Sequence, residues 1–224
     1  MYLLVNSLRI EILPVTPISQ NCMMIWDPDS ADAIISDPGG DLESIVRLIE
    51  SKNVCVQSIL LTHGHFDHVG VALPLQTFLE HKYQKKIPIL GPAIEDQFLL
   101  DRVVEDASQF GVYIQHASNV TPTRFVEDGD ILQFGEMVFE VMHMPGHTPG
   151  HVIFYEKNAR FVITGDVLFK GAIGRTDFPY GNEKQLITAI NQKLLILDDA
   201  TFVLPGHGPV TTIGYEKGHN PFLI

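Results

Sequence analysis

The sequence predicts one mixed α and β domain spanning residues 1–224, with two runs of strands. Two observations lead to this expectation. Short apolar segments bounded by Asp, Pro and Gly turns fill residues 9–37 and return after residue 124, whereas helical spacing prevails in much of the stretch between them. Hydrophobic residues make up 45% of the chain and charged ones 19%, which is ordinary for a globular protein with a substantial core.

Strands and helices alternate through the first half of the chain. Asp41 stands where a helix N-cap is expected, because Ile45 and Ile49 then fall on one helical face. Turns at residues 27–30 and 38–40 separate the first strands. The expected elements, in order, are strands at 9–13, 22–26 and 33–36, a helix from 42, a strand at 56–61, a helix at 71–81, a strand at 87–90 and helical spacing over 94–110.

Hairpins are the main feature expected in the second half of the chain. Gly135 and Glu136 form a tight turn between two strands, and a second pair of strands follows a histidine-rich loop at residues 143–151. Apolar residues at helical spacing, among them Leu186 and Ile190, predict a late amphipathic helix. The expected elements are strands at 131–134, 137–142, 152–155 and 160–164, a helix at 183–197 and a last strand at 201–204.

A cluster of metal-type side chains follows the strand at residues 56–61. His63 and His65 are two residues apart, so on extended backbone their side chains leave from the same face. Asp67 and His68 follow at a turn, where they can point at a second position beside the first. Imidazole and carboxylate groups at this spacing suit zinc or another first-row metal. The alternative is a polar loop that caps the strand, with Asp67 as the cap of the next helix.

Three later strands also end in a side chain of metal-ligand type, namely His147, Asp166 and His207. Each of these loops alone is a weak signal, because Gly-Asp and Gly-His-Gly are also common turns. In α/β architectures, however, ligand sites gather at the carboxyl ends of strands. Together with the first cluster the loops supply seven ligand groups, which predicts two divalent metals with open positions. Zinc is the expected metal, and iron or manganese can replace it according to availability.

The remaining polar residues and cysteines receive structural interpretations. His81 and His116 lie in polar stretches and are expected at the solvated surface. For Asp37 a turn or capping role is preferred over support of a nearby site. Cys22 and Cys55 lack a Cys-x-x-Cys partner, so they are interpreted as core residues of a protein from a reducing compartment.

Charge and hydropathy narrow the range of partners. The chain carries 15 Lys and Arg against 27 Asp and Glu, a net charge of −12, and two divalent metals would still leave it acidic. An acidic surface argues against a nucleic-acid partner. No run approaches the roughly 18 apolar residues of a membrane span, and Arg9 and Glu11 interrupt the short apolar N-terminus, which makes it a poor signal peptide. We expect a cytoplasmic protein without a membrane partner.

Four motifs resemble, in order and approximate spacing, those of the metallo-β-lactamase superfamily. They are Thr-His-Gly-His-Phe-Asp-His at 62–68, Pro-Gly-His-Thr-Pro-Gly-His at 145–151, Gly-Asp at 165–166 and Pro-Gly-His-Gly at 205–208. The resemblance implies an α+β fold, a four-layer αββα sandwich with the metals at one sheet edge. It also implies a role for each ligand: one metal is held by His63, His65 and His147, the other by Asp67, His68 and His207, and both by Asp166.

Within the superfamily the chain resembles compact glyoxalase II-like proteins of the hydroxyacylglutathione hydrolase type. Residues 145–150, 174–179 and 220–223 carry this resemblance. In full-length glyoxalase II a C-terminal helical domain supplies basic residues that grip glutathione, and nothing after His207 is long enough to do so. Lys170 and Arg175 are candidates for binding substrate carboxylates, with a structural Arg-Asp pair as the alternative for Arg175.

The same resemblance implies the roles of two further histidines and the chemistry of the site. His151 is similar to a residue that supports the metals without usually binding them, and His143 is assigned to a hairpin end. Two metals about 3.5–4 Å apart lower the pKa of a bridging water toward about 7, so hydroxide can attack a thioester carbonyl while Asp67 and Asp166 fix the metals. The thiolate leaves without a strong general acid because its free pKa is about 8.5.

The implied activity is hydrolysis of S-2-hydroxyacylglutathione, such as lactoylglutathione, or of a similar small-molecule thioester. Two other functions compete with it. A mono-iron glutathione persulfide dioxygenase shares the Gly-Arg-Thr-Asp-Phe stretch at 174–178, but its last histidine usually precedes an aspartate, whereas Gly208 follows His207 here. The third candidate is a non-catalytic metal-binding domain, which the seven intact ligand positions disfavour. A nuclease or an exported β-lactamase fits the charge and the N-terminus less well.

Overall fold

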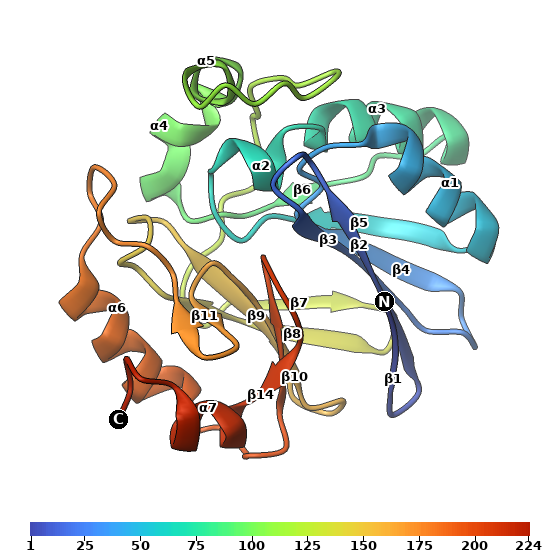
Figure 1. Ribbon diagram of the computed structural model, residues 1–224. Coiled ribbons are helices and arrows are strands. Elements are labelled where there is room, and N and C mark those ends of the chain that lie inside the picture. The colour runs from blue at the N-terminus through green and yellow to red at the C-terminus, as the bar shows by residue number, and fades with distance from the viewer.

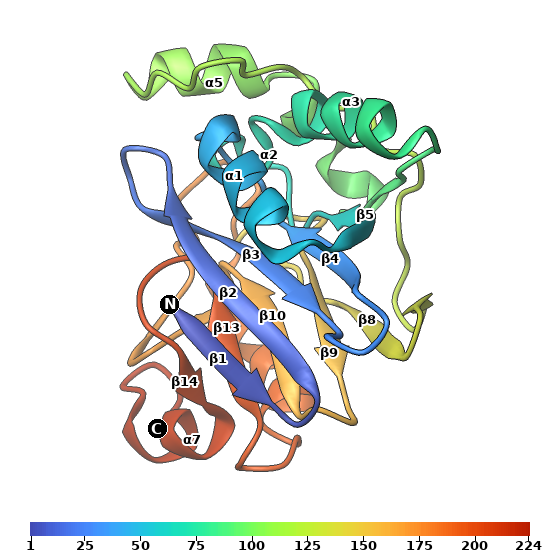
Figure 2. The same cartoon turned by 90° about the vertical axis from the view of Figure 1, so that its right-hand side faces the viewer.

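Two six-stranded β-sheets lie face to face, and helices cover the outer face of each (Figure 1). The computed structural model describes residues 1–224. Figure 2 shows α1 (Leu42–Lys52) and α3 (Ala72–Tyr83) above the first sheet and α7 (Ile213–His219) beneath the second. None of the helices has the length and apolar character needed to cross a bilayer. The four-layer αββα arrangement implied by the resemblance is confirmed.

The first sheet has the strand order β1-β2-β3-β4-β5-β6. Its first four strands are antiparallel neighbours, whereas β4, β5 and β6 run parallel. Parallel neighbours need a crossover connection, and α1 and α3 lie in the two crossovers. The strands are β1 (Tyr2–Val5), β2 (Leu8–Val15), β3 (Gln20–Trp26), β4 (Asp32–Ser36), β5 (Cys55–Leu60) and β6 (Ile89–Leu90).

The second sheet has the order β14-β13-β10-β9-β8-β7, and only β10 and β13 run parallel. The crossover between these two strands contains α6 (Glu183–Ala189), which continues as a π-helical turn over Ile190–Leu194. The strands are β7 (Ile131–Phe134), β8 (Met137–His143), β9 (Val152–Glu156), β10 (Phe161–Gly165), β13 (Phe202–Pro205) and β14 (Thr211–Thr212), and a separate hairpin consists of β11 (Leu168–Phe169) and β12 (Ala172–Ile173).

Apolar side chains form three clusters, one at each boundary between neighbouring layers. Alternation along the strands sends residues to both sides of a sheet. In β9, Phe154 packs between the two sheets, whereas Ile153 packs with the residues of α6. In β3, Ile25 joins the cluster between the sheets and Met24 the cluster under α1 and α3. Strands buried on both faces explain the continuous apolar runs in the sequence.

The segment from residue 94 to residue 110 departs most from the expected elements. It divides into a 3-10 turn (Ile94–Asp96), α4 (Gln97–Leu100) and α5 (Val103–Gln109). Val103 is buried, but Phe98 is 37% exposed, so the expected inward face is only partly formed. The sequence pattern also does not predict α2 (Phe66–Val69), α7, β1, β14 or the β11–β12 hairpin, because such short elements carry too few repeats of a period.

Two single-residue expectations hold only in part or not at all. Asp41 is the N-cap residue of α1 as expected, but its side chain makes no capping bond, and its Oδ2 instead accepts a hydrogen bond from Thr16 N–H at 2.9 Å. Cys22 is buried as expected. Cys55 is only half-buried at the start of β5, where its Sγ lies 3.4 Å from Lys85 Nζ, so its interpretation as a core residue is wrong.

Candidate metal centre

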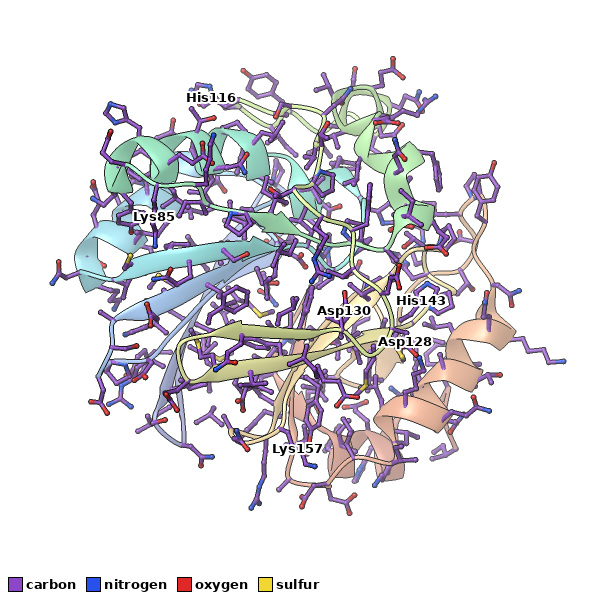
Figure 3. All side chains as sticks on the ribbon, turned by 180° about the vertical axis from the view of Figure 1, so that it is seen from behind. Lys85, His116, Asp128, Asp130, His143 and Lys157 are labelled. Carbon is purple, nitrogen blue, oxygen red and sulfur yellow. The ribbon has the colours of Figure 1, made fainter.

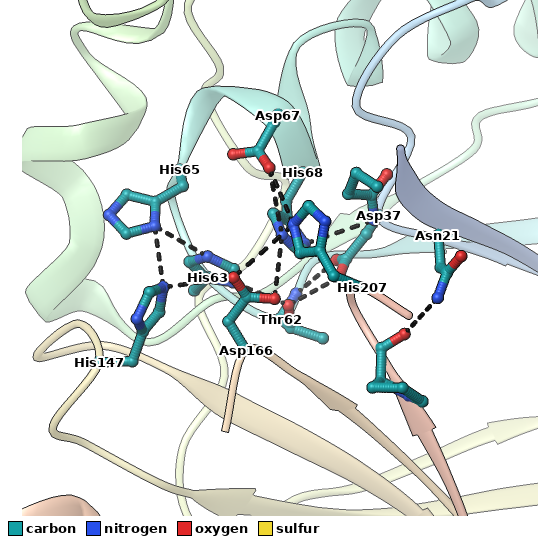
Figure 4. Close-up of polar contacts among 12 residues, drawn as sticks. Asn21, Asp37, Thr62, His63, His65, Asp67, His68, His147, Asp166 and His207 are labelled. Atoms are coloured by element: carbon teal, nitrogen blue, oxygen red, sulfur yellow. Dashed lines mark hydrogen bonds and ion pairs between the residues drawn. The ribbon is translucent and has the colours of Figure 1, made fainter. Parts of the chain in front are cut away.

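Four strands from both sheets deliver their following loops to one place (Figure 4). β5 leads to His63, β8 to His147, β10 to Asp166 and β13 to His207. All seven side chains expected as metal ligands therefore lie together, and each belongs to at least one group that could hold a metal ion.

Three histidines form the first group. His63 Nε2 lies 3.1 Å from His65 Nδ1, and His147 Nε2 lies 3.0 Å from the same atom. The rings meet nearly edge to face, with centroids 4.8, 4.9 and 4.7 Å apart. Three imidazole nitrogens that converge on one point form the donor set of a zinc-type site with an open position.

Asp67, His68 and His207 form the second group, and the short helix α2 supplies the first two. Asp67 Oδ2 lies 3.2 Å from His207 Nε2 and 3.7 Å from His68 Nε2. Asp166 lies between the two groups. Its Oδ1 is 3.3 Å from His68 Nε2, and its Oδ2 is 3.6 Å from His147 Nε2. A carboxylate that reaches both groups has the placement that a bridging ligand requires.

Two buried polar atoms at the centre of the site, His68 Nε2 and Asp166 Oδ1, lie 3.3 Å apart without a well-aligned hydrogen bond to each other or to any other group. Such atoms are costly to leave unpaired, roughly 1–3 kcal/mol each, and a cation between them would satisfy both. The turn after β13 allows their close approach, because a Cβ at Gly206 would overlap both Asp166 Oδ1 and His68 Cε1. The donor set and the unpaired atoms fit divalent cations.

Burial keeps the histidines of the first group neutral. It lowers the pKa of His65 to about 3, with help from His147. It also lowers the pKa of His63 well below its ordinary value, and His68 adds to that effect. Burial lowers the pKa of His147 as well, although Asp166 opposes the change. Neutral imidazole is the form that binds a metal.

Acidic neighbours have the opposite effect on His68. Burial disfavours its charged form, but Asp166 and Asp67 outweigh burial and raise the pKa of His68 well above its ordinary value. Burial likewise opposes ionisation of Asp166, yet His68 outweighs it and holds the pKa of Asp166 below its ordinary range. This position therefore favours positive charge, supplied by a proton or by a metal ion that displaces the proton.

Asp37 supports the site, and the turn or capping role preferred from the sequence is wrong. Its Oδ1 accepts a hydrogen bond from Thr62 N–H at 2.8 Å, and its Oδ2 accepts one from Thr62 Oγ1 at 2.7 Å and lies 3.0 Å from His68 Nδ1. Parallel pairing of β4 with β5 explains the contact, because it places the residue after β4 beside the residues after β5. A partner at Nδ1 directs the Nε2 of His68 into the site.

Two further contacts orient the other ligands. His151 Nε2 accepts a hydrogen bond from Asp166 N–H at 3.0 Å, and its ring stacks on His63 with centroids 4.6 Å apart. His147 Nδ1 lies 2.7 Å from the backbone oxygen of Arg175, which leaves Nε2 to face the site. The supporting position of His151 agrees with the role that the resemblance implies.

Asp96, the last residue of the 3-10 turn, supports the site, and its sequence context does not predict this role. Its side chain is fully buried. Oδ2 accepts hydrogen bonds from Gly64 N–H at 2.9 Å and from the Thr148 hydroxyl at 2.7 Å, and Oδ1 accepts one from Gly150 N–H at 2.6 Å. Asp96 therefore ties the loop after β5 to the loop after β8. Its neighbour Glu95 is exposed, and nothing in the local pattern distinguishes the two carboxylates.

The loop that carries His207 is held by β3 of the opposite sheet. Asn21 Nδ2 donates hydrogen bonds to Pro205 O at 3.0 Å and to Gly208 O at 2.9 Å, and Asn21 N–H donates to Gly206 O at 2.7 Å. The sequence pattern does not predict this role, and its one signal is a polar Gln-Asn pair at the start of an apolar strand. His207 is thereby fixed from both sheets.

The other histidines lie outside the site. His81 and His116 are exposed, as expected, and Figure 3 shows His116 at the outer surface. His116 Nε2 lies 3.4 Å from Glu43. His143 ends β8 near Asp128 (Figure 3), and its Nε2 lies 2.8 Å from the backbone oxygen of Pro149. A hairpin-end role for His143 agrees with these contacts.

A cavity of about 890 Å³ opens beside the site, and five of the seven ligand side chains line it. Arg175 also lines the cavity, where its guanidinium donates two hydrogen bonds to Asp177, at 2.9 and 2.8 Å, and lies 4.3 Å from the ring centroid of Phe178. Lys170 is not among the lining residues, and its Nζ lies 5.2 Å from the ring centroid of Tyr215. Of the two candidate cations for substrate binding, Arg175 is the one that reaches the cavity.

Comparison with known proteins agrees with the fold and the donor set. Residues 15–207 match the sequence model of the metallo-β-lactamase superfamily, which is most of the chain. The chain therefore belongs to the metallo-β-lactamase superfamily, whose members bind divalent metals in a site of histidines and aspartates.

One relative places it more narrowly, as a glyoxalase II-like hydrolase, and two solved structures share its fold. The chain is 45% identical over 217 residues to the hydroxyacylglutathione hydrolase GloC of Haemophilus influenzae, covering 96% of this chain and 98% of the relative. The B3 metallo-β-lactamase BLEG-1 superposes with a TM-score of 0.85 at 33% identity, over 96% of this chain and 99% of that one. TTHA1623, solved in a di-iron-bound form, gives a TM-score of 0.81 at 37% identity, over 94% and 100%.

Proposed function

We propose that this protein is a metal-dependent thioester hydrolase that cleaves S-2-hydroxyacylglutathione, such as lactoylglutathione, or a similar small-molecule thioester. One observation carries the proposal: two groups of largely buried histidine and aspartate side chains meet at Asp166 and open into a substrate-sized cavity. The 45% identity to a hydroxyacylglutathione hydrolase supports the choice of substrate class. The net charge of −12 is consistent with a small-molecule substrate rather than a nucleic acid.

The proposed centre is binuclear. When bound, two divalent metals supply Lewis acidity and lower the pKa of water toward about 7, so a nucleophile exists at neutral pH. The nitrogen-rich first group favours zinc, and iron or manganese can replace it according to availability. TTHA1623, which has the same fold, was solved in a di-iron-bound form. The proposed ligands are His63, His65 and His147 for one metal, Asp67, His68 and His207 for the other, and Asp166 for both.

The side chains of the protein hold charge and position the substrate. Burial opposes ionisation of Asp67, but His68 outweighs it and keeps the pKa of Asp67 below its ordinary value, so Asp67 and Asp166 both stay ionised at neutral pH. Arg175 lies where a substrate carboxylate can reach it, provided that Asp177 shares the guanidinium. The thiolate product has a free pKa of about 8.5 and therefore leaves without a strong general acid.

Hydrolysis of S-D-lactoylglutathione by the metal-loaded protein, with and without a chelator, tests the proposal. Turnover that the chelator abolishes is expected. Asp166→Ala should lose metal and activity together, and retention of two tightly bound metals by this variant would contradict the bridging role. His81→Ala and His116→Ala are the matched controls, because they remove exposed histidines and should leave turnover unchanged.

The same metal-loaded protein can be used to distinguish the proposed thioesterase from two alternative functions. The likeness to BLEG-1 favours hydrolysis of a β-lactam as a second candidate, which a chromogenic cephalosporin would report. A mono-iron glutathione persulfide dioxygenase would contain one iron per chain and consume oxygen with glutathione persulfide. Two metals per chain together with turnover of the thioester alone would exclude both alternatives.

A further inference from the structure

The cavity beside the metal site has an aromatic wall, which we define as Phe98, Phe110, Phe178 and Tyr180. The ring centroids of Phe98 and Tyr180 lie 5.1 Å apart, and those of Phe110 and Phe178 lie 6.0 Å apart. Phe178 also lies 5.4 Å from the ring of His65, so the wall extends to the proposed metal ligands.

The aromatic wall is built from two distant parts of the chain and remains open to solvent. Phe98 lies in α4 and Phe110 directly follows α5, whereas Phe178 and Tyr180 lie between β12 and α6. Phe98, Phe110 and Tyr180 are 37%, 58% and 73% exposed. A concave cluster of exposed rings is unfavourable in water and marks a surface that an apolar group covers.

Both arginines that line the cavity already have carboxylate partners. Arg102 pairs with Glu105 and Asp106, each at 3.4 Å, and Arg175 makes its two hydrogen bonds to Asp177. The other charged side chains of the lining, apart from the histidines, are carboxylates. Glutathione carries two carboxylates, and in this cavity each would have to compete with a carboxylate of the protein for a cation.

We propose, on the basis of the thioesterase activity proposed above, that the aromatic wall binds an apolar or aromatic arm of the thioester. The carbonyl then lies at the metal ligands and the arm lies against Phe110 and Phe178. The arm can belong to the acyl group or to the thiol, because both leave the same carbonyl carbon. The preferred substrate is therefore a thioester with an apolar arm rather than lactoylglutathione itself.

The kcat/KM of the metal-loaded protein for three thioesters shows whether an apolar arm is preferred, and whether it belongs to the acyl group or to the thiol. S-D-lactoylglutathione is the reference. The S-benzyl thioester of lactate places an aromatic ring on the thiol side, and S-mandeloylglutathione places one on the acyl side. One of the two aromatic esters should exceed the reference by roughly tenfold or more, the effect expected for burying a phenyl ring. A reference value equal to or above both would overturn this inference while leaving the thioesterase in place.

Variants of the wall provide the second measurement. Phe110→Ala and Tyr180→Ala should each reduce the advantage of the aromatic ester several-fold without a matching loss on lactoylglutathione. Tyr113→Ala is the matched control, because Tyr113 is 81% exposed and does not line the cavity. Equal losses on all esters would overturn the proposed contact. No turnover of any ester by protein with two bound metals would overturn the thioesterase and this inference together.

Discussion

The buried carboxylate of Asp96 is expected to make the stability of the fold depend on pH, and Asp96→Asn should remove that dependence. Burial raises the pKa of Asp96 to about 6, although the Thr148, Gly64 and Gly150 hydrogen bonds oppose the rise. A carboxyl group whose pKa is raised by folding binds its proton more tightly in the folded protein than in the unfolded chain.

The sign and the size of the effect follow from the two pKa values. The contribution of Asp96 to stability is complete below its ordinary pKa of 3.8 and is lost as the pH rises through about 6. The difference between those values corresponds to about 3 kcal/mol, of which about 2 kcal/mol should be lost between about pH 4.5 and about pH 7.5.

Urea unfolding of the metal-free protein, followed by circular dichroism over that pH range, measures the effect. The quantity of interest is the free energy of unfolding of the wild type minus that of Asp96→Asn, because other titrating groups cancel in this difference. It should fall by about 2 kcal/mol as the pH rises. Glu95→Gln is the matched control for loss of one carboxylate, because the neighbouring side chain is exposed. A difference that stays constant within about 0.5 kcal/mol would refute the reasoning.

Three further substitutions have defined outcomes. Asp37→Ala should weaken metal binding about 10–100-fold in competition with a chelator, because it removes the carboxylate that contacts Nδ1 of His68. An unchanged affinity would contradict that supporting role. Gly39→Ala should lower the free energy of unfolding by more than about 3 kcal/mol, because the added Cβ would overlap the Asp67 carbonyl. Gly218→Ala is the control and should cause no such loss, because a Cβ at Gly218 meets no other atom. Asp177→Asn should lower the KM for lactoylglutathione by releasing its arginine; an unchanged KM would assign that ion pair a structural role.

The sequence predicts the fold best where a strand is buried on both faces. The apolar runs of β3, β9 and β10 stand out because two layers cover each of these strands. Residues 94–110 have helical spacing as well, but only parts of that stretch pack on the core. It begins as a 3-10 turn that ends at the buried Asp96, and it is interrupted at residues 101–102, between α4 and α5. The residue pattern also does not show that the two runs of strands form separate sheets, which only the family resemblance implies.

The side chains that converge on the site were predicted more completely than those that support them. The proposed ligand residues follow strands closely, so strand ends and histidine spacing predict where they lie. Asp37, Asp96 and Asn21 instead contact residues distant in the chain, and each of these contacts depends on tertiary structure. A single sequence contains no pairing information for such contacts, and a turn or a helix start is then the simpler interpretation.

Two carboxylates from different elements hold the first histidine motif in place. Asp37, directly after β4, contacts Thr62 and His68, and Asp96, in the 3-10 turn, accepts a hydrogen bond from the backbone between the first two histidines. These contacts do not involve the nitrogen and oxygen atoms that converge on the centre. The backbone that carries both proposed metal groups is therefore ordered by the protein itself, so metal binding need not supply that ordering free energy. The same rigidity leaves the exposed rings of the aromatic wall, Phe98, Phe110 and Tyr180, as the part of the cavity where substrate preference can change without disturbing the proposed ligands.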